Sequence, residues 1–387
     1  MIFFISLCIL LFAIYAFLLI FYRKAWSSIP YFNINADKTG GFSTRISVVI
    51  PVRNEENNIL GLLESLAVQS YPKNLYQIII IDDHSTDNTW NLLQNFYHPN
   101  LSSIFSKLSD FSAGLKSPAY KKLAIETGIQ LSSGDIIVTT DADCIPAKDW
   151  LKTIASFYQK TGAKFIAAPV KISAGESILS IFQTLDFIAL QGITGASVFK
   201  KFHSMCNGAN LAYEKNVFHE VNGFRGIDNI PSGDDMLLMH KIYKKYPDKI
   251  FFLKNENAIV STAAETNWKG FIHQRTRWAS KADKYDDKRI FWVLLLVYVI
   301  NLLFLILAIT SFWNYAYFAL LITLLIAKTI IEYPFVKSAA SFFQQEELMK
   351  YFPLLQPVHI IYTVFIGFLG KFGSYQWKGR KVVSRKL

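Results

Sequence analysis

The sequence predicts an α/β domain with a mostly parallel sheet and helices on both faces, together with transmembrane α-helices at both ends of the chain. Three observations lead to this prediction. Uncharged apolar runs of membrane-spanning length lie near both ends of the 387 residues. Between them, short β-branched runs alternate with segments of helical periodicity, which is typical of a parallel sheet. Polar clusters follow several of these runs, at the strand ends where such sheets bind ligands.

The N-terminal apolar run predicts a membrane anchor. Residues Ile2 to Tyr22 carry no charge, and at about 1.5 Å per residue they can span a hydrocarbon core of about 30 Å. Arg23 and Lys24 follow directly, which favours a cytoplasmic location for this end. A signal peptide is the alternative, but its positive charge would precede the apolar core. We therefore expect an anchor at residues 1–24 and a polar linker at 25–44.

The central segment, residues 45–288, has an ordinary composition and predicts the α/β domain. Three β-branched runs are expected as strands: Ile46–Ile50, Tyr76–Ile81 and Ile136–Thr140. Three segments with helical spacing are expected as helices: Glu55–Gln69, Asp87–Phe96 and Tyr120–Leu131. Because the carboxyl ends of parallel strands meet at one edge of a sheet, the polar clusters after these strands are expected to lie together.

The C-terminal part, residues 289–370, predicts further membrane helices. Phe291–Phe312 and Tyr315–Phe335 are joined by a few residues and are expected to form a transmembrane hairpin. A full crossing by the shorter run at 354–369 would place the basic tail at 371–387 outside, against the usual distribution of positive charge. We therefore expect interfacial or re-entrant helices within 338–370, with a full span as the alternative.

Two charged residues interrupt the third apolar run. Lys328 and Glu332 are four residues apart, so their side chains lie on one face of a helix. We expect them to form an ion pair near the end of the helix. The alternative is a functional site within the membrane, where ionisable residues are costly and often functional.

Composition excludes some classes of protein. Hydrophobic residues make up 52% of the chain and charged residues 18%, which is too apolar for an ordinary soluble protein. The net charge of +11 is often a sign of nucleic-acid binding. Here basic residues adjoin apolar runs, so we expect anionic membrane lipids as partners and no nucleic acid. Three cysteines do not make a disulfide framework, and we expect free thiols.

The segment Thr140-Asp141-Ala142-Asp143 predicts a cation site. Two carboxylates directly after an apolar strand repel each other, by about 4 kcal/mol for charges about 4 Å apart at an effective dielectric near 20. A divalent cation removes this repulsion, and hard oxygen ligands suit Mg²⁺ or Mn²⁺. Such a cation keeps positions open for phosphate oxygens. Acids in a solvated turn are the alternative, so the rest of the chain has to supply the context.

Six ordered motifs supply that context. They are Ile50-Pro51-Val52-Arg53-Asn54-Glu55-Glu56, Ile81-Asp82-Asp83-His84-Ser85-Thr86-Asp87-Asn88-Thr89, Thr140-Asp141-Ala142-Asp143, Cys206-Asn207-Gly208-Ala209-Asn210, Gly233-Asp234-Asp235 and Gln274-Arg275-Thr276-Arg277-Trp278. Together they resemble the family 2 glycosyltransferases with the GT-A fold. The last motif is similar to the membrane-embedded branch that contains cellulose, hyaluronan and poly-N-acetylglucosamine synthases and ceramide glucosyltransferases.

The resemblance implies an inverting transfer from a nucleotide sugar, most often a UDP-sugar. It assigns donor contacts to Pro51, Glu55, Asp82, Asp83, Lys121, Asp141 and Arg277. It assigns the metal to Asp143, with Asp141 beside it. It assigns the catalytic base to Asp235, with Asp234 as the rival. It places the acceptor beside Asn207, Gly208, Asn210, Gln274 and Trp278, the last by stacking.

The chain departs from the family pattern in three places. His84 stands where glycine is commoner, Tyr120 precedes Lys121 where glycine often occurs, and the base motif has Asp234 in place of the frequent glutamate. The first two departures concern contacts with the nucleotide rather than the class of reaction.

The function that we expect is a multi-pass membrane glycosyltransferase with a cytoplasmic catalytic domain, of the kind found in a bacterial inner membrane. Its acceptor is expected to be a membrane lipid or a lipid-linked glycan. A processive β-polysaccharide synthase that needs a membrane partner subunit is the first alternative. A non-catalytic membrane protein that binds nucleotide sugars is the second.

Overall fold

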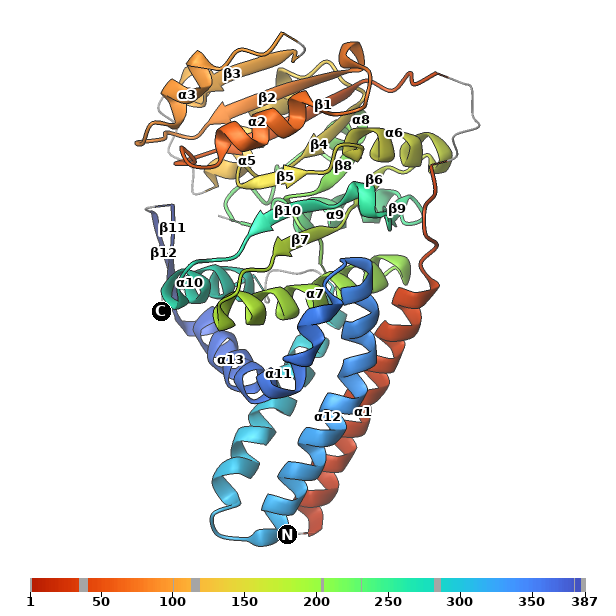
Figure 1. The fold of residues 1–387 in the computed structure, drawn as a ribbon, viewed down its shortest axis with the longest axis vertical. Helices are drawn as coiled ribbons and strands as arrows, with labels where there is room; N and C mark the ends of the chain where they lie inside the picture. The colour runs from red at the N-terminus through yellow and green to blue at the C-terminus, as the bar shows by residue number, and fades with distance from the viewer. Residues whose placement is uncertain are drawn as a thin grey trace. The chain divides into compact units, whose positions relative to one another are not determined.

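The computed structural model describes residues 2–34, 41–99, 101–112, 119–202, 205–230, 232–281, 287–378 and 380–383. Contacts divide the chain into two compact units, which are described separately (Figure 1). The α/β unit comprises Ile29–Ser173 and Ser197–Ala263, and the helical unit comprises Met1–Ser28, Ala174–Ala196 and Ala264–Leu387. Parts of the predicted linker (35–40) and of the basic tail (379 and 384–387) lie outside the described residues.

A seven-stranded, mainly parallel sheet forms the α/β unit, as the sequence predicts. The strand order is β3-β2-β1-β4-β8-β6-β9, and β8 is antiparallel to both of its neighbours. The strands are β1 (Ile46–Val52), β2 (Tyr76–Asp82), β3 (Ser103–Lys107), β4 (Ile136–Thr139), β6 (Phe165–Ala167), β8 (Leu211–Glu214) and β9 (Ile250–Phe252). Side chains of β1, β2 and β4 are buried almost throughout, because these strands lie in the interior of the sheet.

A second sheet of three strands has the order β5-β10-β7. Its strands are β5 (Cys144–Pro146), β7 (Val170–Ser173) and β10 (Val260–Ala263). Because β5 begins only three residues after Asp141, the turn between β4 and β5 that carries Asp141 and Asp143 is held between the two sheets.

Helices of the α/β unit agree in type with the sequence prediction. They are α2 (Ile59–Ala67), α3 (Thr89–Asn95), α4 (Ser109–Ser112), α5 (Tyr120–Gln130), α6 (Trp150–Thr161), α8 (Lys215–Glu220) and α9 (Met236–Lys245), with short 3-10 turns at Lys73–Leu75 and Glu256–Ala258. Helix α5 packs closely on β1, since a Cβ atom at Gly128 would lie 2.4 Å from Val49 Cγ1. This close packing fixes the start of α5, where Lys121 lies, against the sheet.

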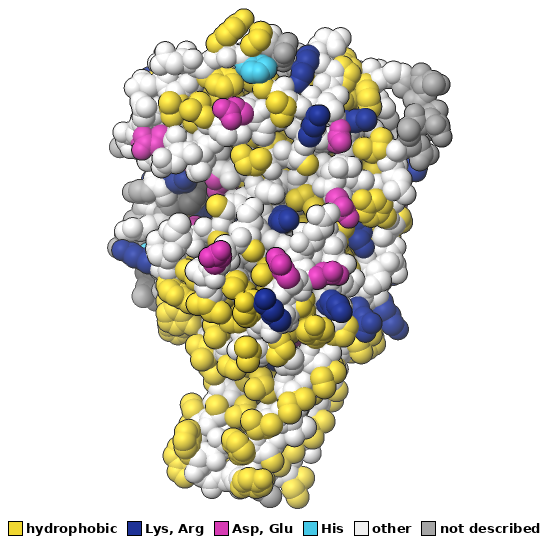
Figure 2. All heavy atoms as spheres, in the orientation of Figure 1, with side chains coloured by type: hydrophobic (Ala, Val, Ile, Leu, Met, Phe, Trp, Pro, Cys, Tyr) yellow, Lys and Arg dark blue, Asp and Glu magenta, His cyan; other side chains and the backbone are white. Residues whose placement is uncertain are grey.

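The helical unit contains α1 (Ile2–Ser28), α7 (Ile178–Phe199, of which the last residues belong to the other unit), α10 (Trp268–Ala279), α11 (Lys288–Thr310), α12 (Tyr315–Phe342) and α13 (Phe352–Phe372), a 3-10 turn at Glu346–Lys350 and a hairpin of β11 (Ser374–Trp377) and β12 (Arg380–Val383). Within the described residues, five helices are long and apolar enough to cross a membrane: α1, α7, α11, α12 and α13. Figure 2 shows hydrophobic side chains over much of the visible surface of the long helices of the helical unit. These features are compatible with membrane association.

Two of these helices differ from the sequence prediction. Helix α12 continues through Pro334 to Phe342, beyond the predicted end at Phe335. Helix α7 is not anticipated by the sequence patterns, and 78% of its most apolar stretch is buried inside the protein. Its apolar composition therefore serves contacts within the protein more than contacts with lipid.

The predicted ion pair in α12 is confirmed, but it does not lie near a helix end. Lys328 Nζ is 2.6 Å from Glu332 Oε1, and ten residues of helix follow Glu332. Gln356 of α13 accepts a 2.7 Å hydrogen bond from Lys328 and donates one of 2.6 Å to Glu332. Tyr15 of α1 also donates its hydroxyl proton to Glu332. A closed polar network thus joins three apolar helices.

Candidate active site

The register of the sheet brings the predicted polar clusters to one edge. Val52 at the end of β1 pairs with Asp82 at the end of β2, and Val49 pairs with Thr139 at the end of β4. All three strands are parallel, so the segments after them leave the sheet on the same side. This is the edge at which open α/β sheets bind their ligands.

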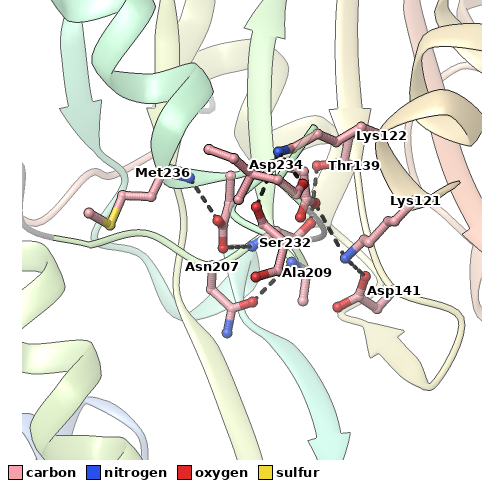
Figure 3. Close-up of polar contacts among 12 residues, drawn as sticks. Lys121, Lys122, Thr139, Asp141, Asn207, Ala209, Ser232, Asp234 and Met236 are labelled. Carbon is pink, nitrogen blue, oxygen red and sulfur yellow. Dashed lines mark hydrogen bonds and ion pairs between the residues drawn. The ribbon is translucent and has the colours of Figure 1, made fainter. Parts of the chain in front are cut away.

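Lys121 lies at the centre of an acidic cluster on this side (Figure 3). Its Nζ atom is 2.7 Å from Asp141 Oδ1 and 3.4 Å from Asp234 Oδ2. The side chain of Lys121 is only 17% exposed, and that of Asp234 only 10%. One ammonium group therefore joins the carboxylate that follows β4 to the carboxylate that precedes α9.

The electrostatics of the cluster keep Lys121 charged. Burial alone would lower the pKa of the Lys121 ammonium, but the negative charges of Asp141, Asp234 and Asp235 outweigh burial and raise this pKa above its usual value of 10.5. Lys121 therefore remains protonated at physiological pH. It can hold an anion, but it cannot accept a proton.

Asp235 is fixed by backbone groups. Its Oδ1 atom accepts a 2.7 Å hydrogen bond from the amide of Met236 and so caps α9, while Oδ2 accepts a 3.3 Å hydrogen bond from the amide of Gly208. Gly233, with a φ of +80°, provides the left-handed turn that delivers both acids. Gly208 permits the close approach, because a Cβ atom there would lie 3.2 Å from Asp234 Oδ2.

Asp82 and Asp83 are both almost fully buried at the end of β2. The amide of Ser85 donates a 3.2 Å hydrogen bond to Asp82 Oδ2, which is the capping turn that Asp side chains favour. His84 adopts a φ of +56°, which explains why glycine is common there, and its Nδ1 lies 3.0 Å from Asp83 Oδ1. The ring of His84 also contacts that of Tyr120, so two of the departures from the family pattern meet in space.

Glu55 and Pro51 lie beside this turn. Glu55 is buried in the turn before α2, its amide donates to Thr89 Oγ1 at 2.8 Å, and its Oε2 accepts from Asn58 at 2.7 Å. Pro51 is half-buried within β1, opposite Ile81. Both residues therefore lie at the predicted edge, where their contact with a nucleotide stays a prediction.

The motif at 206–210 lies against the acidic cluster around Lys121, because Gly208 contacts Asp234 and Asp235. Asn207 Oδ1 accepts a 3.0 Å hydrogen bond from the amide of Ala209, and Thr139 donates to the carbonyl of Gly208 at 3.1 Å. Asn210 requires a correction, because it is completely buried. Its amide donates to the carbonyls of Pro169 and Ala258 and accepts from the indole of Trp150. Asn210 therefore does not make the direct contact with the acceptor that the sequence predicts. It connects segments of the two sheets instead.

Asp143 and Asp141 are the carboxylates that the sequence predicts as ligands of a divalent cation. Asp143 is exposed, and it accepts a long 3.6 Å hydrogen bond from the Cys144 thiol. Burial, and then the charges of Asp143 and Asp141, raise the pKa of that thiol, so it stays a proton donor. Within the described residues, no group of three His, Cys, Asp or Glu side chains forms an all-protein metal cage. Mg²⁺ is typically held by one or two carboxylates, water and substrate phosphates, which suits this pair of oxygen donors.

The last predicted motif lies on α10, in the helical unit. Gln274 donates to Glu265 Oε1 at 3.2 Å, and the ring of Trp278 contacts that of Phe187 on α7. Arg277 is half-buried. Arg275 is 2% exposed and pairs with Asp186 of α7 at 3.0 Å, with its guanidinium 4.2 Å from the centre of the Trp278 ring. Arg275 therefore supports Trp278 from within the helical unit.

Three residues with clear roles in these surroundings are not singled out by the motifs. Arg53 donates to the carbonyls of Asp83 and His84, at 2.6 and 2.8 Å, and so holds the turn after β2. Lys122 binds backbone carbonyls of the loop before Asp234. Asp186 is an isolated acid in an apolar segment, a pattern that indicates a buried charged partner. Arg53 lies within the first motif and Lys122 follows Lys121, but the sequence gives no sign of these contacts.

Comparisons with known proteins agree with this architecture. The model of the family described as glycosyl transferase family 2 matches residues 47–221, and the model of glycosyl transferase family group 2 matches residues 136–366. A mannosyltransferase from Pyrobaculum calidifontis, solved with GDP-Man and Mn²⁺, has a similar fold with a TM-score of 0.54. The two chains are 18% identical, and the likeness covers 94% of this chain and 98% of that one. The predicted α/β fold of the GT-A type is thus confirmed.

Proteins of related sequence are named as glycosyltransferases or as a glycolipid synthase. A probable glycosyltransferase of Bacillus subtilis, YdaM, is 27% identical over 61% of this chain and 54% of its own length. Glycosyltransferase AglE of Haloferax volcanii is 32% identical over 46% and 51%, and a beta-monoglucosyldiacylglycerol synthase of Nostoc is 26% identical over 65% and 51%. The chain thus spans about half the length of these relatives. Since one family model alone matches more than half of the chain, this protein belongs to the family 2 glycosyltransferases.

Proposed function

We propose that this chain transfers a sugar from a nucleoside diphosphate donor, UDP in the first instance, to a hydroxyl group of a membrane lipid or lipid-linked glycan. Transfer occurs at the cytoplasmic face and inverts the anomeric carbon. The observation that carries the proposal is the cluster of Lys121, Asp141, Asp234 and Asp235 at the ligand-binding edge of the sheet. It combines a permanent cation, one of the two carboxylates proposed as metal ligands and a carboxylate base.

The roles of the residues follow from their charges. The acceptor oxygen attacks the anomeric carbon, and the bond from that carbon to the diphosphate oxygen breaks. Asp235 takes the proton of the acceptor hydroxyl, a contribution that is typically 10²- to 10⁴-fold for a positioned carboxylate. Lys121 offers an ammonium to the departing diphosphate, which leaves with the bonding electrons. Asp234 neutralises Lys121 before the donor binds and helps to orient it.

A metal ion fits this chemistry. Asp143 and Asp141 would hold Mg²⁺ or Mn²⁺ together with the donor phosphates. When bound, such an ion supplies Lewis-acid stabilisation of the charge that grows on the leaving diphosphate. The mannosyltransferase with a similar fold was solved with Mn²⁺ and a nucleotide sugar, which supports the proposal.

A lipid acceptor is supported by two observations. Helices α1, α11, α12 and α13 are apolar and largely exposed, as expected of segments that contact lipid. One relative is named as a synthase of a glucosylated diacylglycerol, which is a membrane lipid. By family resemblance, Arg277 is proposed to face the donor diphosphate, and Gln274 and Trp278 to face the acceptor.

The decisive experiment uses membranes that contain the full chain. They are incubated with a panel of radiolabelled UDP-sugars and Mn²⁺ and then extracted with organic solvent. We expect label from one sugar to enter the lipid phase. A ladder of products would instead indicate a processive polysaccharide synthase. The absence of transfer and of donor hydrolysis with every sugar would contradict the proposal and favour a non-catalytic sugar-nucleotide-binding protein.

Removal of divalent metal tests the cation site. We expect EDTA to abolish transfer and added Mg²⁺ or Mn²⁺ to restore it, because Asp141 and Asp143 need an ion to engage the diphosphate. Transfer of label into lipid is measured before and after the addition. The variant Asp143→Asn should raise the Mn²⁺ concentration needed for half-maximal rate. Full activity in EDTA would argue against a metal-dependent reaction.

Replacement of Lys121 tests the anion site. We expect Lys121→Met to weaken UDP binding about tenfold or more, because a charge-assisted contact with the diphosphate is lost. Titration calorimetry in detergent measures the affinity. Unchanged affinity would remove Lys121 from the donor site.

The same variant has a defined dependence on pH. Because the pKa of Lys121 is raised in the folded protein, its stabilising effect is complete below the usual lysine value of 10.5 and is lost only as pH rises through the raised value. The difference in unfolding midpoint between the wild type and Lys121→Met should therefore be constant between about pH 6 and about pH 9. A difference that disappears within this window would contradict the assignment of charge.

A further inference from the structure

The loop before the proposed base is attached to a buried lysine. Lys122 is 2% exposed, and its Nζ atom donates to the backbone carbonyls of Ile227, Ile230 and Ser232. The three distances are 2.6, 2.9 and 3.1 Å. An ammonium group has three N–H bonds, and three carbonyl oxygens match them. A buried cation is tolerated when its donors are used in this way.

This loop carries the acids of the active site. It connects α8 to α9, and Ser232 is followed directly by Gly233, Asp234 and Asp235. Asp235 is fixed on its C-terminal side, because it caps α9 through the amide of Met236. On the N-terminal side, Lys122 binds the loop as far as the carbonyl of Ser232, which lies two residues before Asp234. The position of the acid pair is therefore set from both directions.

Lys121 and Lys122 are consecutive residues of α5 with different binding partners. Neighbouring residues on a helix point in directions about 100° apart, so Lys121 and Lys122 reach different groups. Figure 3 shows Lys121 against the carboxylates of Asp141 and Asp234, and Lys122 against Ser232 of the loop. Because α5 packs tightly on β1, this turn of helix ties the acid loop to the carboxyl ends of the strands.

We propose that Lys122 is a positioning residue for the reaction: by holding the carbonyls of Ile227, Ile230 and Ser232 it places Asp235 where it can accept the proton of the acceptor hydroxyl. The inference rests on the proposed function, because it concerns the step that Asp235 carries out. Lys122 itself touches neither sugar nor nucleotide. It acts through the loop, and an error of about 1 Å in the position of a catalytic group can cost about a hundredfold in rate.

The chain offers a matched control. Lys73 also donates to three oxygen atoms, the carbonyls of Ala67 and Gln69 and the hydroxyl of Tyr76, at 2.5, 2.9 and 2.9 Å. These groups lie at the end of α2 and the start of β2, and none of them belongs to the cluster around Lys121. Lys73→Met therefore removes the same number of hydrogen bonds from the same unit without disturbing the acid loop.

The experiment compares Lys122→Met and Lys73→Met in the purified full chain, with the UDP-sugar that the wild type uses in the presence of Mn²⁺. We expect Lys122→Met to lower kcat about tenfold or more, with the donor KM changed by less than about twofold. Lys73→Met should leave kcat unchanged. In the background of Asp235→Asn, adding Lys122→Met should cost nothing more, because both changes remove the same step. Equal kcat values in the two lysine variants, or a full additional loss in the double variant, would overturn the proposal.

Hydrogen exchange gives a readout that does not need activity. Amides of residues 227–230 and 232–239 should exchange faster in Lys122→Met than in the wild type, and Lys73→Met should leave them unchanged. If Lys122→Met does not fold, Lys122→Gln keeps two N–H donors and serves in both measurements. Failure of the wild type to transfer any sugar would refute the proposed function. Unchanged exchange in the loop would refute the anchoring role independently.

Discussion

Asp235→Asn is expected to reduce turnover about a hundredfold or more while UDP binding changes little. The amide is not basic, so the proton of the acceptor hydroxyl no longer has an acceptor in the transition state. Asparagine keeps an oxygen for the amide of Met236 and is itself a good N-cap, so α9 should remain in place. The rate of sugar transfer and the affinity for UDP are measured on the same preparation.

Two controls separate catalysis from folding. Asp287 caps α11 through the amide of Arg289, so Asp287→Asn makes the same substitution at another helix N-terminus. It should leave turnover unchanged. Asp234→Asn tests the rival base. Its carboxylate pairs with Lys121, so we expect it to weaken the donor affinity more than it lowers kcat. If Asp235→Asn keeps full turnover and Asp234→Asn loses it, Asp234 rather than Asp235 is the catalytic base.

Glu332→Gln is expected to lower the free energy of unfolding by about 3–5 kcal/mol, the usual result when one partner of a buried ion pair is removed. Glutamine keeps the shape of the side chain and polar atoms for Tyr15 and Gln356. It removes the negative charge beside Lys328, which is completely buried in an apolar helix. Unfolding is followed by circular dichroism as sodium dodecyl sulfate is added to the protein in a mild detergent.

A double variant shows that charge is the cause. Lys328→Met combined with Glu332→Gln removes both charges and leaves the amide groups of the network in place. Replacing both members of a buried pair is often nearly neutral, so most of the lost stability should return. If the double variant is as unstable as Glu332→Gln, geometry rather than charge explains the effect. If Glu332→Gln itself costs less than about 1 kcal/mol, the pair is not important for the assembly of these helices.

Much of the fold was predictable because its signals are local. The runs at Ile46–Ile50, Tyr76–Ile81 and Ile136–Thr140 form parallel strands within one or two residues of their predicted bounds. The helices predicted from spacing begin later than expected only where polar turns precede them, as at Glu55 and Asp87. Buried β-branched runs and amphipathic spacing are determined by the nearest residues along the chain.

The site was predictable only in part, and for a different reason. Asp82 and Asp141 come to one edge because parallel strands deliver their carboxyl ends there, which is a general rule of topology. Lys121, at the start of α5, and Asp234, just before α9, join them only through tertiary contacts. Asn210 was wrongly given to the acceptor, because the motif does not reveal that Trp150, Pro169 and Ala258 use its amide. Burial of a particular polar atom depends on residues that are distant in the chain.

The sequence by itself determined the membrane-spanning lengths, the alternation of strands and helices, and the family, since each depends on periodicity or on short ordered motifs. Only the tertiary structure decided which charges meet. Lys122 reaches the loop of residues 227–232, Arg275 reaches Asp186, and Gln356 completes the pair of Lys328 and Glu332. Each of these contacts joins elements whose separation along the chain gives no indication of their separation in space, and the cost of burying a charge without a partner is what maintains them.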